Sequence, residues 1–111
     1  MKLLPKIADG KFEFTTTTSA NIPKNAVAMI KEVEGTTLIT PTDKTGSGVF
    51  ALISLMNKTQ LTQIGVTAKF SKTLADAEIP CNVFAGFYHD HILVPYHLRE
   101  KAIEIISKIE I

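Results

Sequence analysis

The chain has 111 residues, of which 45% are hydrophobic and 21% are charged, and its formal net charge at pH 7 is +1. A chain of this length buries roughly two-thirds of its unfolded surface, so it can form one core without metals or disulfides. Twelve Lys and Arg residues against eleven acids argue against binding to nucleic acid or to an anionic membrane, which requires clustered positive charge.

Cysteine content and the N-terminal segment indicate the compartment. A single cysteine cannot form an internal disulfide, which is typical of a reducing environment. Pro5 and Lys6 interrupt the N-terminal segment too early for the apolar region of a signal peptide. The longest largely apolar run, residues 49–56, is too short to span a bilayer. We therefore predict a cytoplasmic protein that binds no membrane.

The first part of the chain is rich in threonine and predicts strands. Phe12 and Phe14 alternate with charged residues, which is typical of a strand with one buried face. A loop rich in Ser, Asn and Pro follows. Residues 26–41 partly fit a helical spacing, but Gly35 separates two segments rich in β-forming residues. We predict a hairpin that turns at Gly35.

One candidate boundary divides the chain. In residues 41–48, Pro41 and two glycines stand among almost no apolar residues. Both alternating faces of residues 49–56 are apolar, so we predict a central strand that is covered on both sides. The boundary predicts an N-terminal part, residues 1–45, made mainly of strands, and a C-terminal part, residues 46–111.

The C-terminal part continues with a loop or frayed turn at residues 57–65 and an amphipathic helix. From Val66 to Ala77, apolar residues recur at helical spacing with lysines on the opposite face. Pro80 is expected to end this helix. Residues 57–80 therefore predict a loop followed by one helix.

Two strands and a second helix complete the chain. The strands, residues 81–88 and 91–95, are predicted to join in a turn at His89 and Asp90. An apolar stripe from Leu98 onward predicts an amphipathic helix with an i,i+4 pair of Glu104 and Lys108. The second part is thus β-α-β-β-α, and three strands of the first part join the same or an adjoining sheet in an α+β fold.

Two of the three histidines, His89 and His91, flank Asp90. In an extended segment residues i and i+2 share a face, so both rings could approach one metal ion. The further ligands Cys81 and His97 lack the spacing of a zinc site, and a hairpin turn would point the two rings apart. No oxyanion hole and no third member can be named for a Cys-His pair. We predict no metal site, no catalytic site and no cofactor.

The segment IGVTAKFSKTLADAEIPCNVFAGFYHDHILVP, residues 64–95, resembles the ACT-like proteins of bacteria. The Gly-Val-Thr-Ala helix start, the Ile-Pro-Cys-Asn strand entry and the Tyr-His-Asp-His-Ile-Leu-Val segment carry the resemblance, and GKFEFTTT and AVAMIKEVEGTTLI extend it over most of the chain. The chain is also distantly similar to the ACT-like domains of the CASTOR arginine sensors. Relatives begin with a longer helical segment, of which only residues 1–7 remain, so that helix is predicted to be short or absent.

The resemblance implies a ferredoxin-like fold of the βαββαβ type, an antiparallel sheet with helices on one face. It also implies two small ACT-like units, residues 1–45 and residues 46–111. In ACT domains effectors bind at the loop between the first strand and the first helix, and Gly65 to Thr67 match that loop.

The residues at this loop, Gly65, Val66 and Thr67, fit a ligand site on physical grounds. The first N–H groups of a helix and its positive dipole end attract a carboxylate. The structural alternative is a tight helix entry at Gly65. The resemblance further implies that Asp90 faces the ligand. Because unperturbed imidazoles titrate there, we also predict that His89 and His91 tune the site between about pH 6 and 7. The alternative for Asp90 is that it only caps its own turn.

The resemblance implies regulation and not catalysis. We predict a regulatory homo-oligomer that binds an amino acid or a similar small metabolite at a domain or subunit interface, and that is not an enzyme. No nucleic acid is expected as a partner. The alternative is a structural module that pairs with itself or with an enzyme subunit and binds no ligand.

Overall fold

A computed structural model of the chain describes residues 1–58 and 62–111. Residues 59–61, in the middle of the predicted loop 57–65, lie outside the described residues. The described strands and helices follow one another along the chain in this order: β1 (Pro5–Ile7), β2 (Lys11–Thr17), β3 (Ala28–Lys31), β4 (Thr36–Thr42), β5 (Phe50–Leu55), α1 (Val66–Asp76), β6 (Asn82–Ala85), β7 (Asp90–Pro95), a short 3-10 helix η1 (Tyr96–Leu98) and α2 (Arg99–Ser107).

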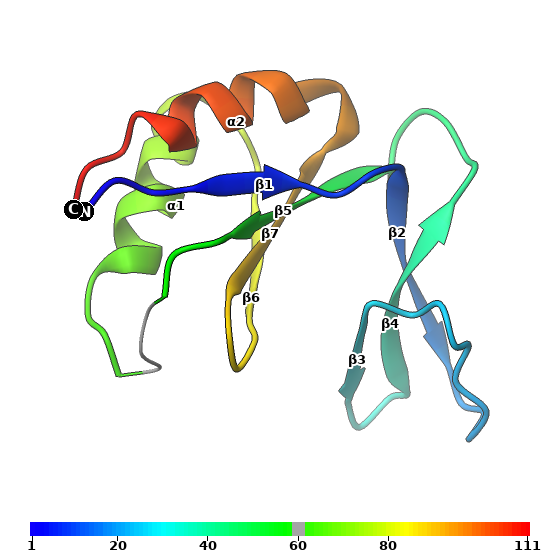
Figure 1. The fold of residues 1–111 in the computed structure, drawn as a ribbon. Coiled ribbons are helices and arrows are strands. Elements are labelled where there is room, and N and C mark those ends of the chain that lie inside the picture. The colour runs from blue at the N-terminus through cyan, green and yellow to red at the C-terminus, as the bar shows by residue number, and fades with distance from the viewer. Residues whose placement is uncertain (59–61) are drawn as a thin grey trace.

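Strands β6, β7, β5 and β1 lie side by side, and α1 and α2 cover one face of them (Figure 1). From β5 onward the chain runs strand, helix, strand, strand, helix, and β1 supplies the strand on the far side of β5. This is the ferredoxin-like arrangement. The N-terminal segment can supply that strand because the two ends of the chain meet. Lys2 forms a bridge with Glu110, and the Ile111 N–H donates to the Met1 carbonyl at 2.7 Å.

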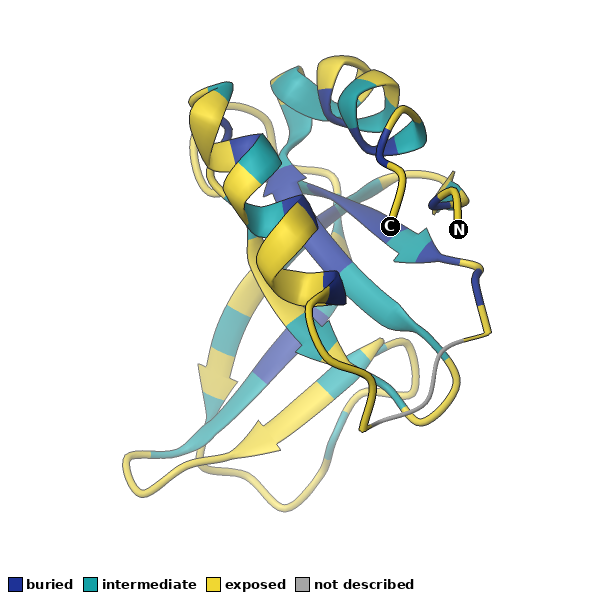
Figure 2. Cartoon of the chain, turned by 90° about the vertical axis from the view of Figure 1, so that its left-hand side faces the viewer, coloured by how far each residue is buried: buried dark blue, intermediate teal, exposed yellow. Residues whose placement is uncertain are grey.

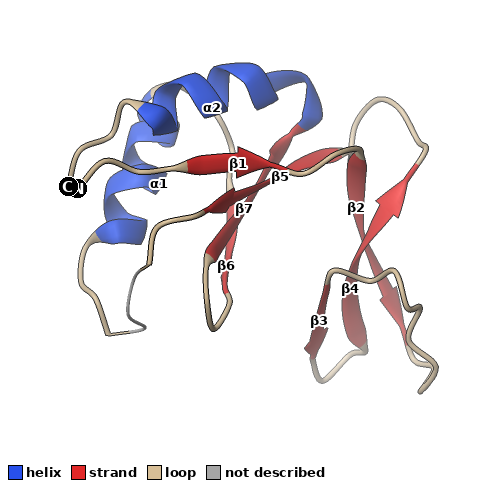
Figure 3. Cartoon of the chain, in the orientation of Figure 1, coloured by secondary structure: helices blue, strands red, loops and turns tan. Residues whose placement is uncertain are grey.

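Strand β1 pairs with the C-terminal end of β5, whereas β2, β4 and β3 extend the sheet from its N-terminal end. These three strands stand apart from the helices (Figure 3). We call these three strands the β-extension. β2 pairs with β4 along its whole length but with β5 only at Phe12 and Phe50. The hairpin predicted at Gly35 is confirmed, since β3 and β4 are antiparallel and the Glu32 N–H donates to the Gly35 carbonyl at 3.0 Å.

The central strand β5 separates two cores, so the prediction that it is covered on both sides is confirmed. Ala51 and Ile53 face the helices, whereas Leu52 faces the opposite way. The larger core lies between helices and sheet, where Figure 2 shows buried strand segments, and consists of Leu3, Ala51, Ile53, Leu55, Val66, Phe70, Leu74, Ile79, Ile92, Val94, Ala102, Ile106 and Ile109. The smaller core, on the helix-free face, consists of Phe12, Ile39, Leu52 and Leu93.

Both predicted helices are confirmed, with one correction at the end of α1. The helix ends at Asp76 and not at Pro80, because Glu78 takes a left-handed conformation with φ 60°. In α2, the predicted pair of Glu104 and Lys108 forms an ion pair with an O–N distance of 3.1 Å.

Two further corrections concern strands. The predicted strand 81–88 is too long and Asp90 does not lie in the turn, because β6 ends at Ala85 and Asp90 pairs with Ala85. The turn spans Gly86 to His89, closed by the Gly86 N–H donating to the His89 carbonyl at 2.8 Å. A Cβ at Gly86 would stand only 3.0 Å from that carbonyl oxygen, so a larger residue there would crowd the turn.

The N-terminal part holds four strands and not three, because residues 5–7 form β1 where a short or absent helix was expected. The structure describes all of residues 1–45, and they contain no helix. They share one sheet with the strands of residues 46–111. The division of the chain into two ACT-like units stays a prediction.

Candidate functional site

The N-terminal end of α1 carries Gly65, Val66 and Thr67. Gly65 has a φ of 96°, which favours glycine, and the space that its Cβ would occupy is open. Among the residues that the structure describes, no side chain caps this helix end. The Val66 side chain is 5% exposed and belongs to the larger core, so it can offer a ligand only its backbone N–H. Thr67 is exposed.

Asp90 begins β7 and faces the same side of the sheet as Ile92, which is the side that the helices cover. Figures 1 and 2 place the start of α1 and the β6–β7 turn at the same end of the helix-covered part. Gly65 to Thr67 and Asp90 therefore share a face and an end of the sheet. Within the described residues, no hydrogen bond or ion pair joins them.

His91 points to the opposite, helix-free face, and three neighbours enclose its ring. Its Nδ1 lies 2.7 Å from the Ser54 hydroxyl oxygen, and the ring stacks on Phe84 with centroids 4.9 Å apart. A Cβ at Gly86 would stand 3.2 Å from its Nε2. Burial lowers the pKa of His91, and the nearby His89 lowers it further, whereas Asp90 acts in the opposite direction. These surroundings favour the neutral form of the His91 ring, which lies within hydrogen-bond distance of Ser54.

A cavity of about 260 Å³ opens beside this pair, at the end of β5. We call it the His89 cavity, and its lining consists of Lys6, Ile7, Ala8, Ser54, Met56 and His89. Lys6 pairs with Ser54 across β1 and β5, so both side chains point to the helix-free face. The His89 Nδ1 is buried and has no hydrogen-bond partner in the described part of the chain.

The His89 cavity combines an ammonium group, a hydroxyl group and an imidazole nitrogen, and its described lining carries no carboxylate. These groups suit a small polar molecule with an acidic group. The predicted site residues therefore separate into two sets. His89 lines the cavity and His91 adjoins it through Ser54, whereas Gly65 to Thr67 and Asp90 lie on the helix-covered face.

Sequence reasoning missed Lys6 and Ser54. Ser54 is the one polar residue in the apolar run of residues 49–56, and a polar side chain in a strand covered on both faces is a signal that could have found it. Lys6 offers no comparable signal, because its place depends on the pairing of β1 with β5.

The described residues give little support to a metal site or a reactive thiol. Within residues 1–58 and 62–111, no three His, Cys, Asp or Glu side chains are grouped so as to hold a metal ion. The pKa of the Cys81 thiol is raised by burial, which disfavours the reactive thiolate. In the same described ranges, no helix has the length and apolar character needed to cross a membrane.

The chain is similar to known proteins in sequence and in structure. The family model for the ACT domain matches residues 45–108. The structure is similar to that of a protein of unknown function from Vibrio cholerae, described as a possible transport protein, with a TM-score of 0.82 and 30% sequence identity over 96% of this chain and 88% of that chain. No curated protein matches the chain.

Two further solved structures are similar in fold. A protein from Agobacterium tumefaciens has a TM-score of 0.76 at 18% identity, over 96% of this chain and 88% of that chain. A chain in a structure of aspartokinase alpha and beta subunits has a TM-score of 0.69 at 13% identity, over 97% of both chains. At these identities the likeness concerns the fold alone.

Proposed function

The chain belongs to the ACT domain family, and from this premise we propose that it binds an amino acid or a similar small metabolite in the His89 cavity and regulates a partner activity in response. The match confirms the resemblance inferred from residues 64–95, and the aspartokinase likeness confirms the ferredoxin-like α+β fold. Membership of the family indicates a small regulatory ligand-binding module. The ligand and its place are our proposal.

The unpartnered Nδ1 of His89 carries this proposal. A buried polar atom without a hydrogen bond costs about 1–3 kcal/mol, and we propose that a ligand in the cavity donates a hydrogen bond to this nitrogen and so recovers the cost. An α-amino group is such a donor. Lys6, on the same cavity wall as Ser54, offers an ammonium group to the α-carboxylate, and Ser54 offers a hydroxyl that His91 holds in place.

The contacts predicted from the sequence define a second arrangement, on the helix-covered face. Here the N–H groups of Val66 and Thr67 would bind the carboxylate and Asp90 the amino group. Their common face and their common end of the sheet support this arrangement. Since the two arrangements use different residues, point variants distinguish them.

Thermal unfolding in the presence of each of the twenty amino acids tests the proposal. An amino acid at 100 times its dissociation constant should stabilise the protein by about 2.7 kcal/mol. We expect at least one to do so, and we expect Lys6→Met and His89→Gln to abolish this response. Lys24→Met, at an exposed loop lysine, is the matched control.

Two outcomes decide between the alternatives. Loss of the response in Asp90→Asn but not in Lys6→Met would move the ligand to the helix-covered face. Stabilisation by none of the amino acids would contradict the proposal and favour a structural module without ligand.

We also propose that the chain is a cytoplasmic homo-oligomer with the ligand near a subunit interface. A monomer by analytical ultracentrifugation, with and without ligand, would contradict this last point.

A further inference from the structure

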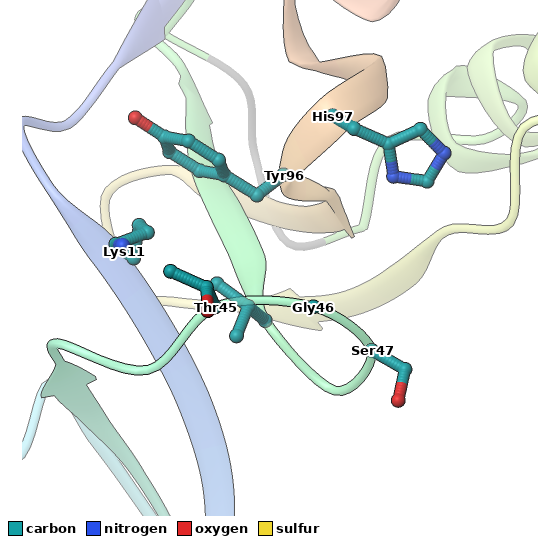
Figure 4. A pocket seen from close by; sticks show the side chains of 7 residues that line it. Lys11, Thr45, Gly46, Ser47, Tyr96 and His97 are labelled. Atoms are coloured by element: carbon teal, nitrogen blue, oxygen red, sulfur yellow. The ribbon is translucent and has the colours of Figure 1, made fainter.

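A second cavity, of about 470 Å³, lies at the opposite end of the β5–β7 pair (Figure 4). We call it the Tyr96 cavity, and its lining consists of Lys11, Thr45, Gly46, Ser47, Val49, Tyr96 and His97. Val49 precedes β5, whereas Ser54 of the His89 cavity lies near the end of this strand. Five residues along a strand span roughly 17 Å, so the two cavities are separate.

Positive charge gathers around the Tyr96 ring. The Lys11 Nζ lies 5.8 Å from the ring centroid, and the Arg99 Cζ lies 3.9 Å from it. An Arg99 N–H also donates to the Tyr96 carbonyl at 2.9 Å, which fixes the guanidinium group there. Glu13, the acid on the Lys11 face of β2, is paired with Lys44 at 3.3 Å. The cavity therefore has the Lys11 ammonium group at its wall, the Arg99 guanidinium group on the ring of its lining residue Tyr96, and no carboxylate among its described lining residues.

The β4–β5 loop supplies neutral donors on the other side of the cavity. Gly46 and Gly48 have left-handed φ angles of 88° and 80°, and the space beside each is open. Among the described residues, no backbone hydrogen bond outside the helices and strands uses the N–H groups of residues 45–48. These groups and the Thr45 hydroxyl are available to an anion.

The remaining wall is apolar and consists of the Val49 side chain and the Tyr96 ring. Figure 4 shows Lys11, Thr45 and Tyr96 grouped around one space, whereas the Ser47 and His97 side chains point away from this group. One side of the cavity is thus suited to negative charge and the other to an apolar body.

We propose that the Tyr96 cavity binds a small organic carboxylate with an apolar body. The carboxylate contacts the Lys11 ammonium group and the N–H groups of the β4–β5 loop, and the body lies against Val49 and the Tyr96 ring. This site is separate from the one proposed for the amino-acid-like ligand and does not depend on it.

Titration of ¹⁵N-labelled protein with benzoate, followed by amide chemical shifts, tests the proposal. We expect benzoate at about 10 mM to shift the amide signals of Gly46, Ser47 and Gly48 and to leave those of Ser54 and His89 in place. Benzyl alcohol, which has the same ring without the charge, should bind about tenfold more weakly, because it lacks the charge-assisted contacts.

Variants locate the contacts. Lys11→Met keeps most of the side-chain stem beside Tyr96 but removes the charge, and it should weaken benzoate binding about tenfold. Lys101→Met, at an exposed lysine of α2, should leave binding unchanged. The amide spectra of both variants report whether the fold is retained.

Three results would overturn the proposal. They are unshifted loop amides in the wild-type protein, equal binding of benzoate and benzyl alcohol, and unchanged benzoate binding in a folded Lys11→Met variant. Phenyl phosphate is the further probe, and tighter binding of it than of benzoate would reassign the cavity from carboxylates to phosphates.

Discussion

The helix-covered part of the sheet and the β-extension are stabilised in different ways. In the helix-covered part, two helices bury one face of β6, β7, β5 and β1 over the larger core. The β-extension has no helix of its own, and apolar side chains such as Phe14, Met29 and Ile30 are 39%, 47% and 46% exposed. Of its buried residues Phe12, Leu38 and Ile39, Phe12 and Ile39 pack on Leu52 and Leu93 of β5 and β7. We therefore expect the extension to depend on the helix-covered part more than the reverse, because the larger core contains no residue of the extension.

The largest expected effect comes from removing an aromatic ring from each core in turn. Phe70 of α1 is 0% exposed in the larger core, and Phe12 of β2 is 5% exposed in the smaller core. Phe70→Ala should lower the free energy of unfolding by about 3–5 kcal/mol and destabilise the whole chain. Phe12→Ala should cost no more than the lower end of that range, since the open neighbourhood can partly close around the gap.

Urea unfolding and amide hydrogen exchange measure the two effects. In Phe12→Ala we expect exchange to accelerate in β2, β3 and β4 while β5 and β7 stay protected. Lys69→Ala, at the exposed neighbour of Phe70, is the control and should change stability by less than about 0.5 kcal/mol. If Phe12→Ala accelerates exchange equally in all strands, the two regions unfold as one unit and are not stabilised separately.

The same contrast explains how far the sequence predicted the fold. Elements with a strong periodic pattern were found, namely the alternation around Phe12, the doubly apolar run that became β5 and the stripes of both helices. β1 was missed because Pro5–Ile7 has no pattern of its own and is a strand only through pairing with residues 53–55, far along the chain. A strand defined by long-range pairing carries little local signal.

In the candidate site, too, residues brought together by long-range strand pairing could not be predicted from local sequence. The histidines His89 and His91 were identified from their spacing, but their different contacts follow from the turn that begins at Gly86, which the alternation alone did not place. Lys6 joins Ser54 only because β1 lies beside β5. Local chemistry was therefore predictable, and the partners that topology brings to it were not.

A second prediction concerns the attachment of the N-terminal segment to the helix-covered part. Asn57 is 8% exposed, its side-chain oxygen accepts from the Leu4 N–H at 2.8 Å, and its amide donates to the Lys2 carbonyl at 2.9 Å. Asn57→Ala leaves these backbone groups without partners, so it should cost about 1–3 kcal/mol. Asn82→Ala, at an exposed asparagine, should cost less than about 0.5 kcal/mol.

Urea unfolding of the two asparagine variants measures this cost, and hydrogen exchange at the Leu4 amide locates it. We expect faster exchange at Leu4 in Asn57→Ala and little change in the β-extension. Unchanged protection of Leu4 would show that the pairing of β1 with β5 holds this segment without Asn57.

The smallest expected effect is a pH dependence that arises on the helix-free face. Burial lowers the pKa of His91 in the folded chain, so the unfolded chain binds this proton more readily. The stability contributed by the neutral ring is present above the unfolded pKa of about 6.5 and is lost as the pH falls through the lower pKa of the folded chain. The unfolding temperature should therefore decrease from about pH 7 to pH 5.

His91→Gln removes the titrating ring and keeps a side chain that can bond to Ser54, so it should reduce this decrease. His97→Gln, at an exposed histidine outside the stack with Phe84, is the control and should retain the wild-type slope. An unchanged slope in His91→Gln would assign the pH dependence to other groups. A reduced slope in His91→Gln, together with wild-type exchange that accelerates first at Ser54 and Phe84 at pH 5, would place the acid-sensitive contacts around His91 on the helix-free face.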